Sequence, residues 1–189
     1  KKMKYLPIII ITTFISGTLF AQTDNSTFVS NTQTTFGIKT GYNAIQFKIE
    51  NENTESVQKE AGIYFGAFIN IPTSDIFSIQ SEILYSSSRY TFKDNINLIH
   101  VPISIQFKLA NNFTGFFGPE IQFLLDIGNL DLNNFNNLML GFNFGASYKI
   151  SSNFSIEAKP YFSFSKLLDN GPGISRKLNI LQIGLAYQF

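Results

Sequence analysis

The sequence predicts an all-β fold, and three patterns in the chain point to it. Apolar and polar residues alternate with a period of two from Phe36 onward, which is the spacing of side chains on opposite faces of a β-strand. No segment shows the three-to-four-residue apolar spacing of an amphipathic helix. Turn-forming residues separate the alternating stretches. These patterns together predict eight strands and no helix from residue 36 onward.

The predicted strands follow one another along the chain with no helix between them, and each is about ten residues long or longer. They cover residues 36–44, 62–71, 77–86, 100–109, 113–126, 138–150, 154–164 and 178–189. In each stretch one face is apolar. The opposite face carries most of the Gly, Ser, amide and charged residues. An even number of strands in up-and-down order returns both ends of the domain to one side.

The connections between the strands alternate in length. The segments 72–75, 110–112 and 151–153 are short, whereas 48–60, 89–95, 126–137 and 166–177 are longer and polar. Short periplasmic turns and long extracellular loops are typical of a transmembrane β-barrel. The predicted fold is therefore an eight-stranded antiparallel transmembrane β-barrel over residues 36–189, in an outer membrane.

A soluble sandwich or a lipocalin-type barrel also alternates, so the period alone does not choose between water and lipid. Three features favour lipid. The strands are longer than the 5–6 residues usual in soluble sheets. Aromatic residues gather near the short turns, where an interfacial girdle belongs. The apolar face carries no charge, which is expected because a charge at the bilayer midplane costs about 2–4 kcal/mol. The ionisable residues on the other face are Lys39, Glu82, Lys108, Glu120, Lys149, Glu157 and Lys159.

Composition excludes several functions. Charged residues make up 14% of the 189 residues and the net charge is +1, which gives no basic footprint for nucleic acid. The chain has no Cys and one His, so thiolate and histidine-rich metal sites are excluded and no cofactor is expected.

The first residues have the layout of a secretory signal peptide. Three lysines precede an apolar run from Tyr5 to Phe20, and cleavage is expected after Ala21. The alternative is a membrane anchor, but the run is shorter than the about 20 residues that a spanning helix needs. Residues 1–21 are therefore expected to be a signal peptide, and residues 22–35 a flexible periplasmic leader.

An eight-stranded barrel is only wide enough for side chains to fill its interior. Its inward face here carries charges of both signs, and unpaired buried charges are costly. We therefore expect a structural ion-pair network inside the barrel. Its members are Lys39, Glu82, Glu120, Glu157 and Lys159. A narrow pore for small solutes is the alternative.

His100 is the residue that suggests catalysis, because it faces inward and Asp126, Glu82 or Arg89 is expected nearby. A general base needs a nucleophile and an orienting partner within hydrogen-bond reach. No G-x-S-x-G motif surrounds any Ser. A hydrogen-bonded wall histidine is favoured, and an enzyme at the barrel rim that uses His100 is the alternative.

Three further patterns receive structural interpretations. The segment Asp131–Asn137 lacks the acidic density of a calcium loop, and 169–175 lacks the strand–helix context of a phosphate loop. Pro102, Pro119 and Pro160 fall inside predicted strands, where we expect β-bulges.

Nearly the whole domain resembles the PorT-like family of small outer-membrane β-barrel proteins from Gram-negative bacteria. The stretches that carry the resemblance are "FGIKTGYN", "IPTSDIFSIQSEILYS", "NLIHVPISIQFKL", "FTGFFGPEIQFLL", "GASYKISSNFSIEAKPYFSF" and "LQIGLAYQF". His100 stands where family members commonly carry Glu. The resemblance implies an outer-membrane location, no shared catalytic residue, and a connection with protein secretion through the members that give the family its name.

The expected function is that of an integral outer-membrane barrel without catalysis, with a structural, secretion-accessory or interaction role in the envelope. Its expected partners are outer-membrane lipid, possible envelope or secretion proteins, and the barrel-assembly machinery. Tyr187 and Phe189 on the final strand resemble the aromatic signal that this machinery recognises.

Overall fold

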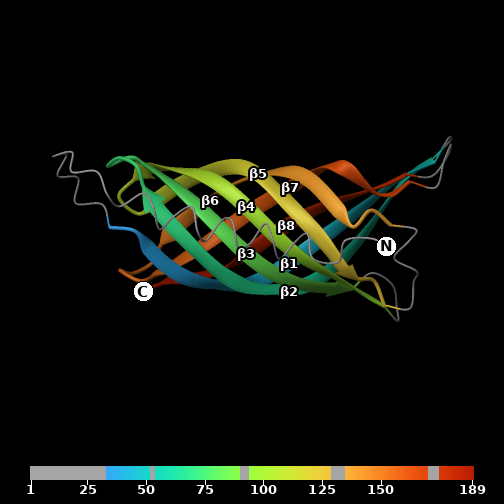
Figure 1. Ribbon diagram of the computed structural model, residues 1–189, viewed down its shortest axis with the longest axis horizontal. Coiled ribbons are helices and arrows are strands. Elements are labelled where there is room, and N and C mark those ends of the chain that lie inside the picture. The colour runs from blue at the N-terminus through green and yellow to red at the C-terminus, as the bar shows by residue number, and fades with distance from the viewer. Residues whose placement is uncertain (1–32, 52–53, 90–93, 129–134, 170–174) are drawn as a thin grey trace, which may run out of the picture. The chain divides into compact units, whose positions relative to one another are not determined.

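Eight antiparallel strands form one closed barrel in the described part of the chain, and β1 pairs with β8 to close it (Figure 1). The strands are β1 (Thr35–Asn51), β2 (Thr54–Pro72), β3 (Phe77–Arg89), β4 (Asn95–Ala110), β5 (Phe113–Asp126), β6 (Leu138–Lys149), β7 (Phe154–Asp169) and β8 (Ser175–Gln188). This order confirms the predicted eight-stranded antiparallel barrel.

The computed structural model describes residues 33–51, 54–89, 94–128, 135–169 and 175–189. The predicted signal peptide and all but residues 33–35 of the predicted leader lie outside the described residues. Among the described residues, no helix is long and apolar enough to cross a membrane.

Two of the predicted long loops are wrong, because their residues continue the strands. Lys48 pairs with Val57 and Asn51 with Thr54, so the first hairpin has only residues 52–53 between its strands. Likewise, Lys166 pairs with Lys177 in β7 and β8. Polar side chains alone do not end a strand when backbone pairing continues. The 19 residues of β2 exceed the about 9–11 that cross a bilayer. Figure 1 shows the β1–β2 hairpin projecting at the long-loop end.

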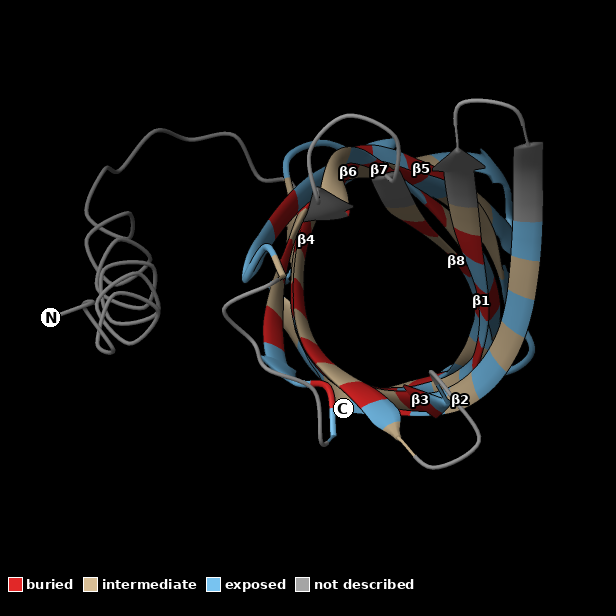
Figure 2. Cartoon of the chain, turned by 90° about the vertical axis from the view of Figure 1, so that its right-hand side faces the viewer, coloured by how far each residue is buried: buried red, intermediate tan, exposed pale blue. Residues whose placement is uncertain are grey.

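Buried and exposed residues alternate along the strands, as Figure 2 shows in a view along the barrel. The exposed large hydrophobic side chains point outward; Ile38, Tyr42, Ile63 and Phe65 are between 52% and 66% exposed. The inward side chains, including Lys39 and Glu82, are buried. An apolar exterior around a filled interior is the pattern that a lipid environment requires.

The predicted aromatic girdle consists of cross-strand pairs at the short-turn end. Phe77 pairs with Phe107, Phe113 with Tyr148, and Phe154 with Tyr187. The Phe154 and Tyr187 ring centroids are 4.8 Å apart. Directly opposed aromatic side chains stabilise a sheet and here place large rings near the short turns.

The predicted bulges at the prolines are wrong. Pro102, Pro119 and Pro160 each keep a regular partner on one side, namely Glu120, Phe142 and Leu181. On the other side the pairing is interrupted, but the register does not change. The reason is that proline removes a single N–H donor, which breaks one ladder bond and inserts no extra residue. Register shifts occur instead between Asn97 and Leu98, between Lys108 and Ala110, and in β7 after Phe162.

Candidate functional site in the barrel lumen

The lumen contains a buried network of two lysines and two glutamates. Lys39 Nζ on β1 lies 2.7 Å from Glu82 Oε1 on β3 and 2.6 Å from Glu157 Oε2 on β7. Lys159 Nζ on β7 lies 2.8 Å from the other Glu82 oxygen. The four charges balance, and each side chain is at most 8% exposed. Balanced, fully paired charges are the condition under which an ion cluster persists in a low-dielectric interior.

Additional hydrogen bonds extend this network toward the short-turn end. Gln80 Nε2 donates to Glu82 Oε1 at 2.8 Å. Asn70 Nδ2 donates to Ser78 Oγ and to Gln106 Oε1, both at 3.0 Å. The Lys39 ammonium also lies 5.1 Å from the centre of the Phe68 ring, a cation–π contact. Contacts at this level therefore link side chains of β1, β2, β3, β4 and β7 inside the lumen.

Glu120 lies apart from these four residues. Its Oε1 is 3.0 Å from His100 Nδ1 and accepts a hydrogen bond from Gln122 Nε2 at 2.8 Å. The sequence could not separate Glu120 from the other inward charges, because alternation gives the face of a residue but not its height in the barrel. Glu82 and Asp126, which we expected near His100, have other partners: Glu82 binds the lysines, and Asp126 accepts from Asn97 and the Gly128 amide.

His100 joins a hydroxyl and a carboxylate in series. Its Nε2 is 2.7 Å from Ser86 Oγ on β3, and its Nδ1 faces Glu120 on β5. With the proton on Nδ1, the ring donates to Glu120 and accepts from the Ser86 hydroxyl. The order serine, histidine, carboxylate is that of a hydrolase triad.

The surroundings of this triad differ from those of a catalytic site. Ser86 and His100 have no exposed surface and Glu120 has 1%. A nucleophile must reach a substrate carbonyl and face donors that stabilise the oxyanion. The geometry instead links three neighbouring strands through buried hydrogen bonds. Ser86 was not singled out from the sequence. The available signal was its spacing of two and four residues from Leu84 and Glu82, which places all three on the inward face of the strand.

An apolar layer occupies the lumen between this triad and the long loops. Its buried members are Ile45, Phe47, Ile96, Leu98, Leu124, Ile127, Met139, Tyr161, Leu167, Leu178 and Ile180, with Phe135 packed against them. Sequence reasoning missed this layer because it expected polar residues throughout the interior. The available signal was the even spacing of Ile45 and Phe47 from Lys39 and Asn43, which places these apolar residues on the same inward face of the strand. Buried aliphatic and aromatic side chains at this height offer few polar groups to water or ions.

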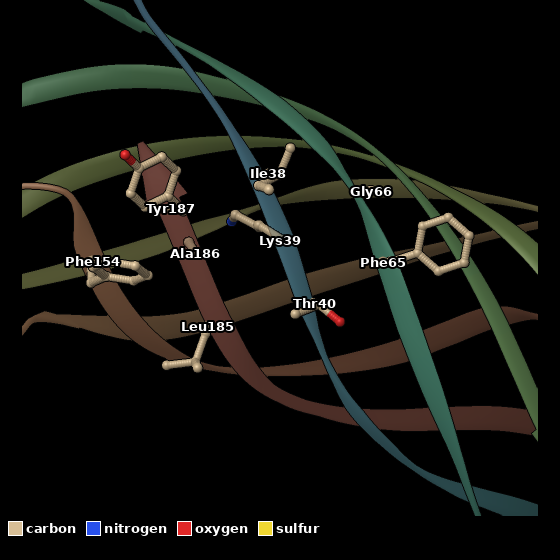
Figure 3. A pocket seen from close by; sticks show the side chains of 9 residues that line it. All are labelled: Ile38, Lys39, Thr40, Phe65, Gly66, Phe154, Leu185, Ala186 and Tyr187. Atoms are coloured by element: carbon tan, nitrogen blue, oxygen red, sulfur yellow. The ribbon is translucent and has the colours of Figure 1, made fainter. Parts of the chain in front are cut away.

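The outer wall carries a shallow hollow of about 380 Å³ near the aromatic girdle. Figure 3 shows its lining residues, which lie on β1, β2, β7 and β8: Ile38, Lys39, Thr40, Phe65, Gly66, Phe154, Leu185, Ala186 and Tyr187. The Thr40 hydroxyl in this lining donates to the Tyr64 carbonyl at 3.0 Å. The lining of this hollow is mostly apolar, so it offers few groups for chemistry.

Within the described ranges, no group of three or more His, Asp or Glu side chains is placed to hold a metal ion. The segments for which the sequence analysis disfavoured a calcium loop and a phosphate loop are residues 131–137 and 169–175. Most of these residues lie outside the described part of the chain.

Comparisons with known proteins agree with the fold. The family model described as "Outer membrane protein beta-barrel domain" matches residues 20–169. Ail, the attachment invasion locus protein of Yersinia pestis, is similar with 14% identity over 83% of this chain and 99% of that chain, at a TM-score of 0.53. Neisserial surface protein A is similar with the same identity and coverages, at a TM-score of 0.52. At this identity the likeness shows the fold alone. No curated protein matches the sequence.

Proposed function

The chain belongs to the outer membrane protein beta-barrel domain family, and from this premise we propose that it is a closed, non-catalytic barrel that acts through its outer surfaces. It is an outer-membrane protein. Its proposed role is structural or secretion-accessory, through contacts with other envelope proteins. The finer assignment to the PorT-like barrels, which rests on the sequence resemblance, supports the secretion-accessory form of this role.

The observation that carries the proposal is a lumen closed at two levels. The ion network spans β1, β3 and β7, and the apolar layer closes the long-loop end above it. An interior without a path for solute argues against the narrow-pore alternative. The buried triad around His100 argues against a rim enzyme, because its serine has no exposed surface.

The extended wall at the long-loop end is the proposed contact surface. β1 and β2 continue their pairing past the length needed for the bilayer, and Val57 on this hairpin is 54% exposed. With short turns in the periplasm, this hairpin faces the cell exterior. A paired ribbon of this kind offers a partner a preformed backbone, which lowers the entropic cost of binding.

Export and assembly form part of the same proposal. Residues 1–21 serve as the export signal and 22–35 as a periplasmic leader. Tyr187 and Phe189 contact the barrel-assembly machinery during insertion. Their rings meet edge to face with centroids 5.4 Å apart, and Phe189 is 72% exposed at the short-turn end of β8.

A site-specific crosslinking experiment tests the proposed contact surface. A photoreactive phenylalanine replaces Val57 on the hairpin in one strain and the membrane-facing Ile79 in a control strain. Illumination of intact cells, followed by purification and mass spectrometry, is expected to give a defined protein adduct from position 57 and lipid adducts from position 79. If both positions yield lipid adducts alone, the proposed interaction role is wrong.

A further inference from the structure

Several buried polar atoms in the middle of the lumen have no hydrogen-bond partner in the described protein. Asn43 and Gln182 each leave both side-chain polar atoms unpaired. Glu120 Oε2, Gln122 Oε1, Asn143 Nδ2 and Tyr161 Oη are also unpaired, as are Ser88 Oγ and Asn97 Oδ1 elsewhere on the wall. The first six residues are at most 2% exposed. Buried polar atoms without a hydrogen-bond partner are rare in folded proteins and call for an explanation.

Strand register places these six residues in one continuous belt. Asn43 on β1 pairs directly with Gln182 on β8, and Gln182 pairs with Lys159, which is two residues before Tyr161 on the same face of β7. Tyr161 in turn pairs with Asn143 on β6.

The belt continues onto β5. The Tyr161 ring lies against Gly141, the partner of Glu120. Gln122 is the next inward residue after Glu120. The unpaired atoms thus line one side of the lumen across β1, β8, β7, β6 and β5.

The same belt has a fixed position between two sealed layers. Along β1 the inward order is Lys39, Gly41, Asn43, Ile45 and Phe47, from the ion network through the belt to the apolar layer. Along β5, Glu120 and Gln122 precede the buried Leu124. Paired charges therefore close the belt toward the short turns, and apolar side chains close it toward the long loops.

The chemistry of the unpaired atoms defines what fits among them. Asn43, Gln182 and Asn143 present amide donors, and Tyr161 presents a hydroxyl. Glu120, Gln122 and the Asn43 and Gln182 carbonyls present acceptors. A bare cation cannot accept hydrogen bonds from the donors, and an anion cannot donate hydrogen bonds to the acceptors. Water both donates and accepts, and a buried water typically makes about three hydrogen bonds to otherwise unsatisfied groups.

We propose that the belt lines an enclosed hydrated chamber in the middle of the lumen, in which ordered water bridges Asn43, Gln182, Glu120, Gln122, Asn143 and Tyr161. The chamber is a binding site for water that is closed at both ends. The interior is therefore wet at mid-height and dry beneath the long loops. This inference does not depend on the proposed interaction role.

X-ray hydroxyl-radical labelling of the folded protein in lipid nanodiscs tests the chamber, because radicals formed from a bound water modify the side chain beside it. Tyr161 and Phe47 are the two reporters, and each is 1% exposed. Both rings belong to the apolar layer, but only Tyr161 carries an unpaired hydroxyl that lies in the belt. We expect mass spectrometry to find Tyr161 modified and Phe47 unmodified. If neither is modified, the chamber is dry. If both are modified, it is not closed toward the loops. Either result overturns the proposal.

A variant and a second measurement complete the test. The double substitution Asn43→Leu with Gln182→Leu removes four of the unpaired atoms, so labelling of Tyr161 is expected to fall severalfold. Unchanged labelling would contradict water bridging in the belt. If this variant does not fold, water-to-amide cross-relaxation in the wild-type NMR spectrum gives the answer. Cross-peaks from the Asn43 and Gln182 side-chain amides support the chamber, and their absence contradicts it.

Discussion

Lys39 on β1 and Glu82 on β3 form a buried ion pair across the width of β2, with 2.7 Å between Nζ and Oε1. The same ammonium lies 2.6 Å from Glu157 Oε2 on β7. One lysine therefore bridges strands on both sides of the β1–β8 seam, where the barrel closes. The stability of the seam should depend on it.

The substitution Lys39→Met tests this dependence. It leaves Glu157 without its cation, and breaking a buried pair from one side costs about 3–5 kcal/mol. We expect the free energy of unfolding to fall by that amount in urea titrations of the protein in phospholipid vesicles, read as unheated gel migration. The matched control is Lys108→Met, at an exposed position on β4. Equal unfolding midpoints for the two variants would show that the network is not stabilising.

The substitution His100→Ala separates a structural histidine from a catalytic one. Removing the ring leaves the Ser86 hydroxyl and the Glu120 carboxylate buried with fewer partners, which costs about 1–3 kcal/mol or more. We expect lower stability and no change in reaction of the folded protein with a fluorophosphonate, because Ser86 is inaccessible. A Ser86 adduct in the wild type that disappears in the variant would make this a hydrolase site.

The substitution Phe47→Ala tests the apolar layer. Phe47 is 1% exposed inside the barrel, and deleting such a side chain costs about 3–5 kcal/mol because a cavity remains. The control is Val57→Ala on the exposed part of the neighbouring strand, where little packing is lost. Equal unfolding midpoints for the two variants in vesicles would mean that the layer is loosely packed.

Much of this architecture was predictable because apolar and polar residues alternate at every second position in all eight strands. Alternation by two assigns Lys39, Glu82, Glu157 and Lys159 to the interior. The difference in length between short turns and long loops distinguishes the two ends of the barrel. Strand extent was harder to predict. Lys48 and Lys166 are polar and so were assigned to loops, yet their backbones pair with Val57 and Lys177.

The arrangement inside the barrel was not predictable from alternation. Strand tilt places residues that are far apart in sequence at one height, so Lys39 meets Glu157 while Glu120 meets His100. These heights depend on the register of all eight strands together. The prolines show the same limit. The sequence shows that Pro102 lacks an N–H, but it does not show that the strand keeps its register there, because this depends on the pairing of Pro102 with Glu120 on β5.

Electrical recordings distinguish a closed barrel from a pore. The ion network and the apolar layer leave no continuous polar path, so we expect planar bilayers containing the purified protein to show only background current. A porin reconstituted in the same lipid serves as the positive control. Reproducible single-channel steps that change with Lys39→Met would assign conduction to this lumen and overturn the proposed closed state.

The glycine pair Gly41–Gly184 gives a prediction about closure of the seam. These residues oppose each other on β1 and β8, and the Tyr64 side chain lies over both. A Cβ on Gly184 would meet the Tyr64 hydroxyl and the Thr40 carbonyl. Overpacking of this kind costs about 1–3 kcal/mol, so we expect Gly184→Ala to lower the urea midpoint and slow the appearance of the heat-modifiable folded band.

The control for the seam is Ala44→Val, which enlarges a side chain on the outer face of the same strand pair, opposite Leu181. Lipid chains can move aside there, whereas the inward Tyr64 ring and the Thr40 backbone have little room to move. The two variants enlarge opposite faces of one wall, and Ala44→Val adds two carbons where Gly184→Ala adds one, so the control is the larger addition. If Ala44→Val impairs refolding as much as Gly184→Ala does, the seam is limited by strand pairing rather than by packing inside the lumen.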